Sequence, residues 1–584
     1  MSTTYGPPPQ SGPDLERSPS RSRTFFGERG TPAGFTARVF TKAMGFSQQD
    51  LARPIIGIAQ TWSEFNNCNN HFRQLAEAVK RGVWQEGGLP LEFPTISLGE
   101  VHTQPTTMLF RNLMAMDTEE MIRAQPMDAV VLLVGCDKTT PAALMGAASA
   151  NIPTIMVSGG PMLNGHYQGQ ELGACTDCGR FTTELRAGTI SSDEYSAIED
   201  AICRSAGSCM VMGTASTMAS VIEGLGMTLP GNAAIPAVDV RRMQLAEQSG
   251  RQSVRLARSG LRPSDILTDA AFENAIRVSM AIGGSTNAVI HLIAIAGRLG
   301  LLLPLERFDQ LSRQTPWIVN LKPSGQFQME ELFDAGGIPA VMQELAPLLR
   351  HEALTVTGET VGERLATYRL TWRRDVIASL AEPLGKEGGT VVLRGNLCPD
   401  GAVLKQSAAS KELLVHRGRA VVFRSIPDMR ARIDDPELDV TEDDVLVLQN
   451  AGPVGAPGMP EVGFMPIPAK LLRQGVRDMV RISDARMSGT SYGTIALHIA
   501  PESAIGGPLA LVRDGDMIAL DVPGRTLTLE VSDEELARRR ATWQRAPLQY
   551  ERGYRQLYQQ HVLQAPEGCD FDFLRLPVGG TLGS

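Results

Sequence analysis

The chain of 584 residues has little of what several classes of protein require. Its net charge is −9 at pH 7, so there is no electrostatic reason to expect nucleic acid or an anionic membrane as a partner. No run approaches the roughly 20 apolar residues that span a bilayer. The N-terminus lacks the apolar core of a secretion signal. We therefore expect a cytoplasmic protein with neither a nucleic acid nor a membrane as its partner.

The first residues, Met1–Gly34, are short of large apolar side chains and rich in Pro, Ser, Gly and Arg. This composition predicts a disordered tail. Its arginines weakly suggest a targeting peptide, but Asp14, Glu16 and Glu28 interrupt them. The rest of the chain is too long for one hydrophobic core, and its length predicts about two to four domains.

Cysteine is also scarce, with eight in the whole chain. In a long chain without a secretion signal, cysteines are expected as reduced thiols or metal ligands rather than as disulfides. Six of them fall within one stretch of 142 residues, namely Cys68, Cys136, Cys175, Cys178, Cys203 and Cys209. This clustering is the first indication of a metal centre.

The segment Ala129–Ala150 carries the most informative local pattern. Its first six residues, AVVLLV, predict a fully buried strand. Gly135 follows, and then a thiol, a carboxylate and an amine in succession, Cys136-Asp137-Lys138. Thr139-Thr140-Pro141 predicts a helix start, with a hydroxyl cap and proline in the first turn. Ligands bind where parallel strands end, so this turn is a candidate active-site edge.

Two other reactive side chains follow predicted strands. Cys68 lies in a polar loop after the strand Arg53–Ile58, and Glu100 comes directly after the strand Pro94–Leu98. Repeated strand–loop–helix units of this length predict a parallel sheet covered by helices. In such a sheet these side chains would meet Cys136 at one edge.

The pattern changes after about residue 385, where short strands separated by turns replace the alternating units. The Pro523-Gly524 pair suits a tight hairpin between the last two strands. We expect an α/β fold with a parallel-sheet domain over residues 35–385 and a β-barrel-like domain over residues 386–584. The predicted strands of the second domain are Val391–Leu393, Ala420–Phe423, Val445–Leu448, Met517–Val522 and Thr526–Val531.

The candidate ligands separate by chemical hardness. Thiolates suit an iron–sulfur cluster or zinc, and the soft set is Cys68, Cys136 and Cys209. Carboxylates suit magnesium, and the hard set is Glu100, Asp137 and Glu461. The adjacency of Cys136 and Asp137 suggests two metal centres side by side, although spacing alone does not decide which metals they hold.

Five motifs together resemble the dihydroxy-acid and sugar-acid dehydratases. They occur in order within about residues 36 to 575, so the resemblance covers nearly the whole chain. The motifs are CDKTTP at Cys136–Pro141, GGSTN at Gly283–Asn287, LKPSG at Leu321–Gly325, GMPE at Gly458–Glu461 and SDARMSGT at Ser483–Thr490.

The resemblance implies an active site between an N-terminal α/β domain and a C-terminal β-barrel domain. It implies a [2Fe–2S] cluster with one open iron position, and Mg²⁺ as a second cofactor. It further implies a homodimer or homotetramer acting on a small hydroxy acid. The implied cluster ligands are Cys68, Cys136 and Cys209, and the implied magnesium ligands are Glu100, Asp137, Glu461 and a carbamylated Lys138.

The catalytic base implied by the resemblance is Ser488, acting together with Lys138. Thr490 could contact the substrate or cap a following helix. The chemistry is removal of the C2 proton and loss of the C3 hydroxyl, which converts a 2,3-dihydroxy acid into a 2-keto-3-deoxy acid. A non-catalytic iron–sulfur sensor is the alternative from another class, and the complete set of implied residues argues against it.

Two features bear on the substrate. Branched-chain dihydroxy-acid dehydratases typically read TDGRFSGG at the serine motif, whereas this chain reads SDARMSGT. With Glu100 in place of an aspartate, this difference favours the sugar-acid branch that acts on arabinonate, xylonate and related aldonates. The alternative is dihydroxy-acid dehydratase of valine and isoleucine synthesis.

Two stretches depart from the family pattern, Val101–Gln104 and Glu171–Arg180. The second contains Cys175-x-x-Cys178, where we would expect no thiols. This pair could be half a zinc site, a redox pair or an incidental loop pair, and of these we favour the last.

Overall fold

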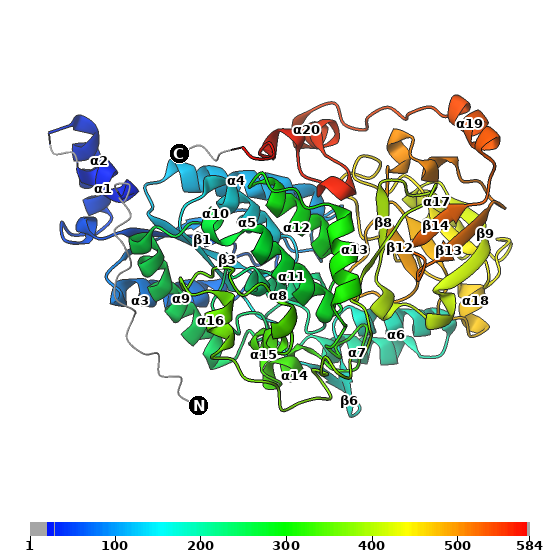
Figure 1. The fold of residues 1–584 in the computed structure, drawn as a ribbon, viewed down its shortest axis with the longest axis horizontal. Coiled ribbons are helices and arrows are strands. Elements are labelled where there is room, and N and C mark those ends of the chain that lie inside the picture. The colour runs from blue at the N-terminus through cyan, green and yellow to red at the C-terminus, as the bar shows by residue number, and fades with distance from the viewer. Residues whose placement is uncertain (1–19, 28–29, 581–584) are drawn as a thin grey trace.

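A computed structural model describes residues 20–27 and 30–580. The chain forms two parts, each built around its own sheet, which lie side by side (Figure 1). The first part contains most of the helices, and the second contains the larger sheet. The predicted α/β fold with a β-rich C-terminal part is confirmed.

The sheet of the first part has four parallel strands in the order β2-β1-β3-β4. All six residues of β3 are buried, as expected for a parallel strand covered on both faces. The predicted strand at Pro94–Leu98 is wrong, because β2 ends at Pro94. β2 can contain prolines because it lies at the sheet edge, where a missing N–H is tolerated. The strands are β1 (Ile55–Gln60), β2 (Leu89–Pro94), β3 (Ala129–Val134) and β4 (Thr154–Ser158).

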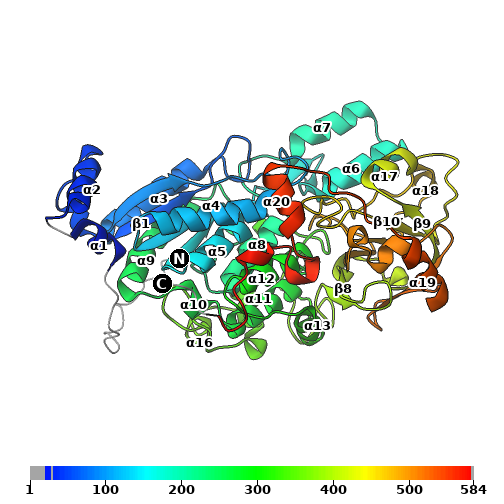
Figure 2. The same ribbon diagram turned by 90° about the horizontal axis from the view of Figure 1, so that it is seen from above.

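Helices cover both faces of this sheet (Figures 1 and 2). α3 (Phe72–Gln85) packs against α9 (Val240–Ser259), and α4 (Arg111–Ala124) packs against α5 (Thr139–Ala150). Buried helices continue the core beyond the sheet. They are α8 (Thr214–Gly224), α11 (Asp269–Ala281), α12 (Asn287–Gly297), α13 (Leu305–Gln314) and α15 (Gly337–Glu344).

The N-terminal segment is ordered further than its composition predicted. Helix α1 (Arg21–Gly27) forms within the expected disordered tail and is followed by α2 (Pro32–Ala43). The hydroxyl of Ser22 donates to the carboxylate of Asp128 at 2.5 Å, and the Phe26 side chain is buried. These tertiary contacts stabilise a segment whose local composition favours disorder. The rest of the predicted tail, residues 1–19 and 28–29, lies outside the described residues.

The second part holds an eight-stranded mixed sheet in the order β14-β13-β9-β10-β11-β12-β8-β7. Arg394 lies just after β7, and its backbone N–H donates to the backbone carbonyl of Arg525, beside β14, at 2.9 Å. This contact brings the two edge strands together and nearly closes the sheet, so the barrel-like prediction is confirmed. The strands are β7 (Val391–Leu393), β8 (Gly401–Leu404), β9 (Val415–Phe423), β10 (Val445–Leu448), β11 (Arg481–Ser483), β12 (Ile495–Ala500), β13 (Met517–Asp521) and β14 (Thr526–Leu529).

Both faces of this sheet are buried. Alternate residues of β10 enter two different clusters, Val445 and Val447 in one, and Leu446 and Leu448 in the other. This follows from the period of two along a strand. Shorter helices cover the sheet and its ends, namely α17 (Ile426–Arg432), α18 (Ala469–Arg473) and α19 (Asp533–Thr542). β13 and β14 pair in the predicted antiparallel hairpin.

The C-terminal segment returns to the first part of the molecule. After α20 (Gly553–His561), the carboxylate of Asp570 accepts two hydrogen bonds from the fully buried guanidinium of Arg298, at 2.6 and 3.0 Å. The hydroxyl of Tyr554 donates to the carbonyl of Leu109 at 2.6 Å. These contacts tie the two parts together. Within residues 20–27 and 30–580, no helix is long and apolar enough to cross a membrane.

Candidate active site

The turn after β3 has the expected position at the carboxyl end of the sheet, but not the expected cap. The N-cap of α5 is Lys138, and Thr139 lies inside the first turn. The Thr139 hydroxyl instead accepts the N–H of Cys136 at 3.0 Å, which fixes the turn that presents the thiol. A Cβ on Gly135 would lie 2.2 Å from the side chain of Asn69 and 3.0 Å from the carbonyl of Cys68. Glycine is therefore needed for the Cys68 loop to pack here.

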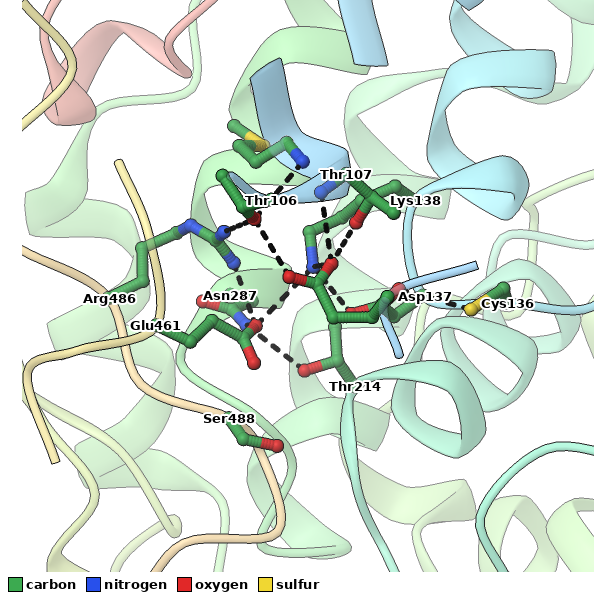
Figure 3. A network of polar contacts seen from close by, with 12 residues as sticks. Thr106, Thr107, Cys136, Asp137, Lys138, Thr214, Asn287, Glu461, Arg486 and Ser488 are labelled. Atoms are coloured by element: carbon green, nitrogen blue, oxygen red, sulfur yellow. Dashed lines mark hydrogen bonds and ion pairs between the residues drawn. The ribbon is translucent and has the colours of Figure 1, made fainter. Parts of the chain in front are cut away.

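The amine of Lys138 lies between three carboxylates that come from different parts of the chain (Figure 3). Its Nζ lies 2.5 Å from Asp137, 3.4 Å from Glu461 and 3.5 Å from Glu100, and its side chain is fully buried. Burial alone would lower the pKa of Lys138. The charges of Asp137 and Glu100 outweigh burial and raise that pKa above its ordinary value. The three carboxylates therefore stabilise a positive charge at the buried position of the Lys138 amine.

A second layer of side chains holds these carboxylates in place. Glu461 accepts hydrogen bonds from Arg486 at 2.8 Å and from the Asn287 amide at 2.9 Å. Glu100 accepts from the Thr106 hydroxyl at 2.8 Å, and Arg486 also donates to that hydroxyl at 3.2 Å. The motif containing Asn287 was recognised in the sequence, but its contact with Glu461 depends on the fold. Arg486, within the serine motif, had no assigned role.

The predicted cluster thiols lie next to this carboxylate group. The Cys136 thiol lies 3.3 Å from the Asp137 carboxylate. Interaction with the Cys68 thiol, together with burial, raises the pKa of Cys136. Cys209 lies before α8, and its thiol is 3.4 Å from that of Cys175. The Cys175 contact was not expected, since we favoured an incidental loop pair for Cys175 and Cys178. No local signal could have shown it, because 34 residues separate Cys175 from Cys209.

Ser488 lies in the loop after β11, in the second part of the molecule (Figure 3). Its hydroxyl lies 2.8 Å from that of Thr490, and the Thr490 N–H points to it at 3.4 Å. Lys405 also contacts this loop, because its amine donates to the carbonyl of Gly489 at 3.1 Å. Sequence reasoning missed Lys405, which lies just after a barrel strand.

The chemistry of the donors fits the two implied cofactors. In the described part of the chain, no three His, Cys, Asp or Glu side chains converge closely enough to hold a metal ion as they stand. However, the three carboxylates already surround a cation, the Lys138 ammonium. The position therefore suits Mg²⁺ once the Lys138 amine has lost its extra proton. Free thiols lie beside it, including buried Cys68 and Cys136, and thiolates are the usual ligands of iron–sulfur clusters.

Both halves of the chain match known family models. Residues 53–364 match the N-terminal domain, and residues 375–569 the C-terminal domain, of the dihydroxy-acid/6-phosphogluconate dehydratases. The chain belongs to this family and is a dehydratase, a carbon–oxygen lyase.

Individual relatives then indicate the branch. The chain is 55% identical to the L-arabinonate dehydratase of Rhizobium leguminosarum bv. trifolii, over 91% of this chain and 92% of the relative. It is 50% identical to the 6-deoxy-6-sulfo-D-gluconate dehydratase of Pseudomonas putida, over 93% and 95%. Identity to the dihydroxy-acid dehydratase of Moorella thermoacetica is 42%, over 91% and 97%. The chain therefore belongs with the sugar-acid dehydratases, and the prediction of the arabinonate branch is confirmed.

Proposed function

We propose that this protein dehydrates a sugar acid of the aldonate class to a 2-keto-3-deoxy acid. The observation that carries the chemistry is the group of three carboxylates around Lys138, with the Cys136 thiol on one side and Ser488 on another (Figure 3). The higher identity to sugar-acid dehydratases than to dihydroxy-acid dehydratases supports an aldonate as substrate.

In this proposal two cofactors bind side by side. Mg²⁺ is held by Glu100, Asp137, Glu461 and a carbamylated Lys138. A [2Fe–2S] cluster is held by Cys68, Cys136 and Cys209. When bound, the two would act as Lewis acids, on the carboxylate end of the substrate and on its leaving 3-hydroxyl. Arg486 and Asn287 would keep Glu461 aimed at its ligand, as outer hydrogen-bond partners do in metal sites.

The proposed base is Ser488, which removes the C2 proton. A serine hydroxyl is a poor base, so the reactive form must be the alkoxide. Two donors support that form, the hydroxyl of Thr490 at 2.8 Å and its N–H at 3.4 Å. An alkoxide accepts such charge-assisted hydrogen bonds more strongly than a neutral hydroxyl does. Thr490 is thus proposed to stabilise the base rather than to cap a helix.

Carbamylation of Lys138 adds CO₂ to a neutral amine, which then loses a proton. The surrounding carboxylates favour the ammonium, so we expect carbamylation only when Mg²⁺ neutralises them. The test is ¹³C NMR of protein supplied with ¹³C-bicarbonate, with and without Mg²⁺. A carbamate signal that appears with Mg²⁺ and is absent from Lys138→Arg is expected. A wild-type spectrum without that signal would refute the carbamate.

The substrate is tested with a panel of four- to six-carbon aldonates and 2,3-dihydroxyisovalerate, following 2-keto acid formation by the anaerobically purified enzyme. We expect turnover of at least one aldonate and loss of that turnover in Ser488→Ala, with the visible absorption of the cluster retained. Activity on the branched acid alone would instead identify a dihydroxy-acid dehydratase. Full activity of Ser488→Ala would exclude Ser488 as the base.

A further inference from the structure

Four thiols lie close to the carboxylate group, in two pairs. The Cys68 loop packs against Gly135, directly beside Cys136. The sulfur of Cys175 lies 3.4 Å from that of Cys209. On a tetrahedral ion with metal–sulfur bonds of about 2.3 Å, two sulfurs are about 3.8 Å apart, close to the observed spacing. A disulfide would require about 2.0 Å. Two pairs of thiols are the ligand set of a [2Fe–2S] cluster with two cysteines on each iron.

The backbone holds Cys175 in this position by several contacts. Cys175 is the N-cap of α6 (Thr176–Ala187) and has φ of +67°, a region that residues other than glycine rarely adopt. The N–H of Gly173 donates to Asp177 at 2.6 Å, and Asp177 is paired with Lys322 at 3.0 Å. The hydroxyl of Thr176 donates to the carbonyl of Thr490 at 2.9 Å. The turn is therefore fixed to the loop that carries the proposed base.

The neighbouring thiol of Cys178 has a different environment. It accepts the N–H of Cys175 at 3.4 Å and lines a separate cavity of about 240 Å³, together with Arg186 and Tyr492. The two thiols of Cys175-x-x-Cys178 therefore have different surroundings, although Cys178 caps the backbone of Cys175. One cysteine belongs to the thiol group and the other does not.

We propose that Cys175 is a fourth, replaceable thiolate ligand of the [2Fe–2S] cluster, on the same iron as Cys209. This inference rests on the proposed function, because dehydration requires one iron position to accept the substrate. On substrate binding, the 3-hydroxyl would replace the Cys175 thiolate as a ligand, and the freed thiolate would take up a proton from solvent. No electron is transferred. Cys175 is exposed, so the released thiol has room to move into solvent.

The test compares wild type with Cys175→Ala and, as the matched control, Cys178→Ala. All three are purified anaerobically, and iron and sulfide are measured per chain. The dithionite-reduced clusters are then compared by electron paramagnetic resonance, with and without an aldonate. Without substrate, we expect Cys178→Ala to match wild type and Cys175→Ala to differ from both. With substrate, the wild-type spectrum is expected to approach that of Cys175→Ala.

A second readout is the rate at which the visible absorption bleaches in air. It should be severalfold faster in Cys175→Ala than in the other two proteins, because one iron is then open to oxygen. A Cys175→Ala protein with a cluster identical to wild type in spectrum and bleaching overturns the inference. If Cys175→Ala retains too little cluster to measure, Cys175→Ser decides, since an oxygen ligand shifts the absorption to shorter wavelength and an unshifted spectrum overturns the inference. Wild-type protein without iron and sulfide would instead refute the cofactor proposed above.

Discussion

Replacing Lys405 by methionine should change how the stability of this protein depends on pH. Lys405 is fully buried, and its amine donates to the carbonyl of Gly489. Burial lowers the pKa of Lys405 from 10.5 to about 7. Each pKa unit corresponds to about 1.4 kcal/mol. Below pH 7 the buried charge therefore costs the folded state about 5 kcal/mol, and methionine removes this cost.

The direction of the pH effect follows from where the proton binds. Between pH 7 and 10.5 the unfolded chain keeps the proton on Lys405 and the folded chain does not, so stability rises with pH. From pH 6 to pH 9, the wild-type protein should gain about 2–3 kcal/mol relative to Lys405→Met. Other titrating groups are common to both proteins and cancel in this difference.

The assay is urea unfolding of cluster-free protein at pH 6 and pH 9. Lys411→Met, which replaces an exposed lysine near Lys405, is the control and should track wild type at both values. If the difference between wild type and Lys405→Met is the same at pH 6 and pH 9, Lys405 does not lose its proton in the folded protein, and the reasoning from burial fails.

Two further predictions concern buried contacts. Asp570→Asn should lower the free energy of unfolding by about 3–5 kcal/mol, because it leaves the buried guanidinium of Arg298 without its closest carboxylate. Asp572→Asn alters only an exposed contact and should cost less than about 1 kcal/mol; equal midpoints in urea would contradict this contrast. Arg486→Met should raise the Mg²⁺ concentration needed for half-maximal turnover about 10- to 100-fold, because Glu461 loses the donor that orients it. An unchanged Mg²⁺ titration would exclude that role.

Several elements could be predicted from the sequence because their causes are local. The apolar run Ala129–Val134 forms β3 with the predicted bounds, and the Pro-Gly turn joins β13 and β14 as an antiparallel hairpin. The motifs identified the family and its sugar-acid branch, since they depend on residue order alone. Two predictions of local structure failed because contacts between distant parts of the chain outweighed the local signal. Strand β2 contains prolines because it is an edge strand, and α1 is ordered by its contact with Asp128.

The sequence by itself determined which residue types carry the chemistry, with thiols and carboxylates in consecutive order at Cys136-Asp137 and a serine in a recognisable loop. Only the tertiary structure decided which of them meet. Glu461 contacts Lys138 although the two lie 323 positions apart in the chain, and Cys175 contacts Cys209 although these lie 34 positions apart. Such contacts depend on how sheets and helices pack, which no local periodicity encodes. For that reason Cys175 could not be assigned to the thiol group before the fold placed it there.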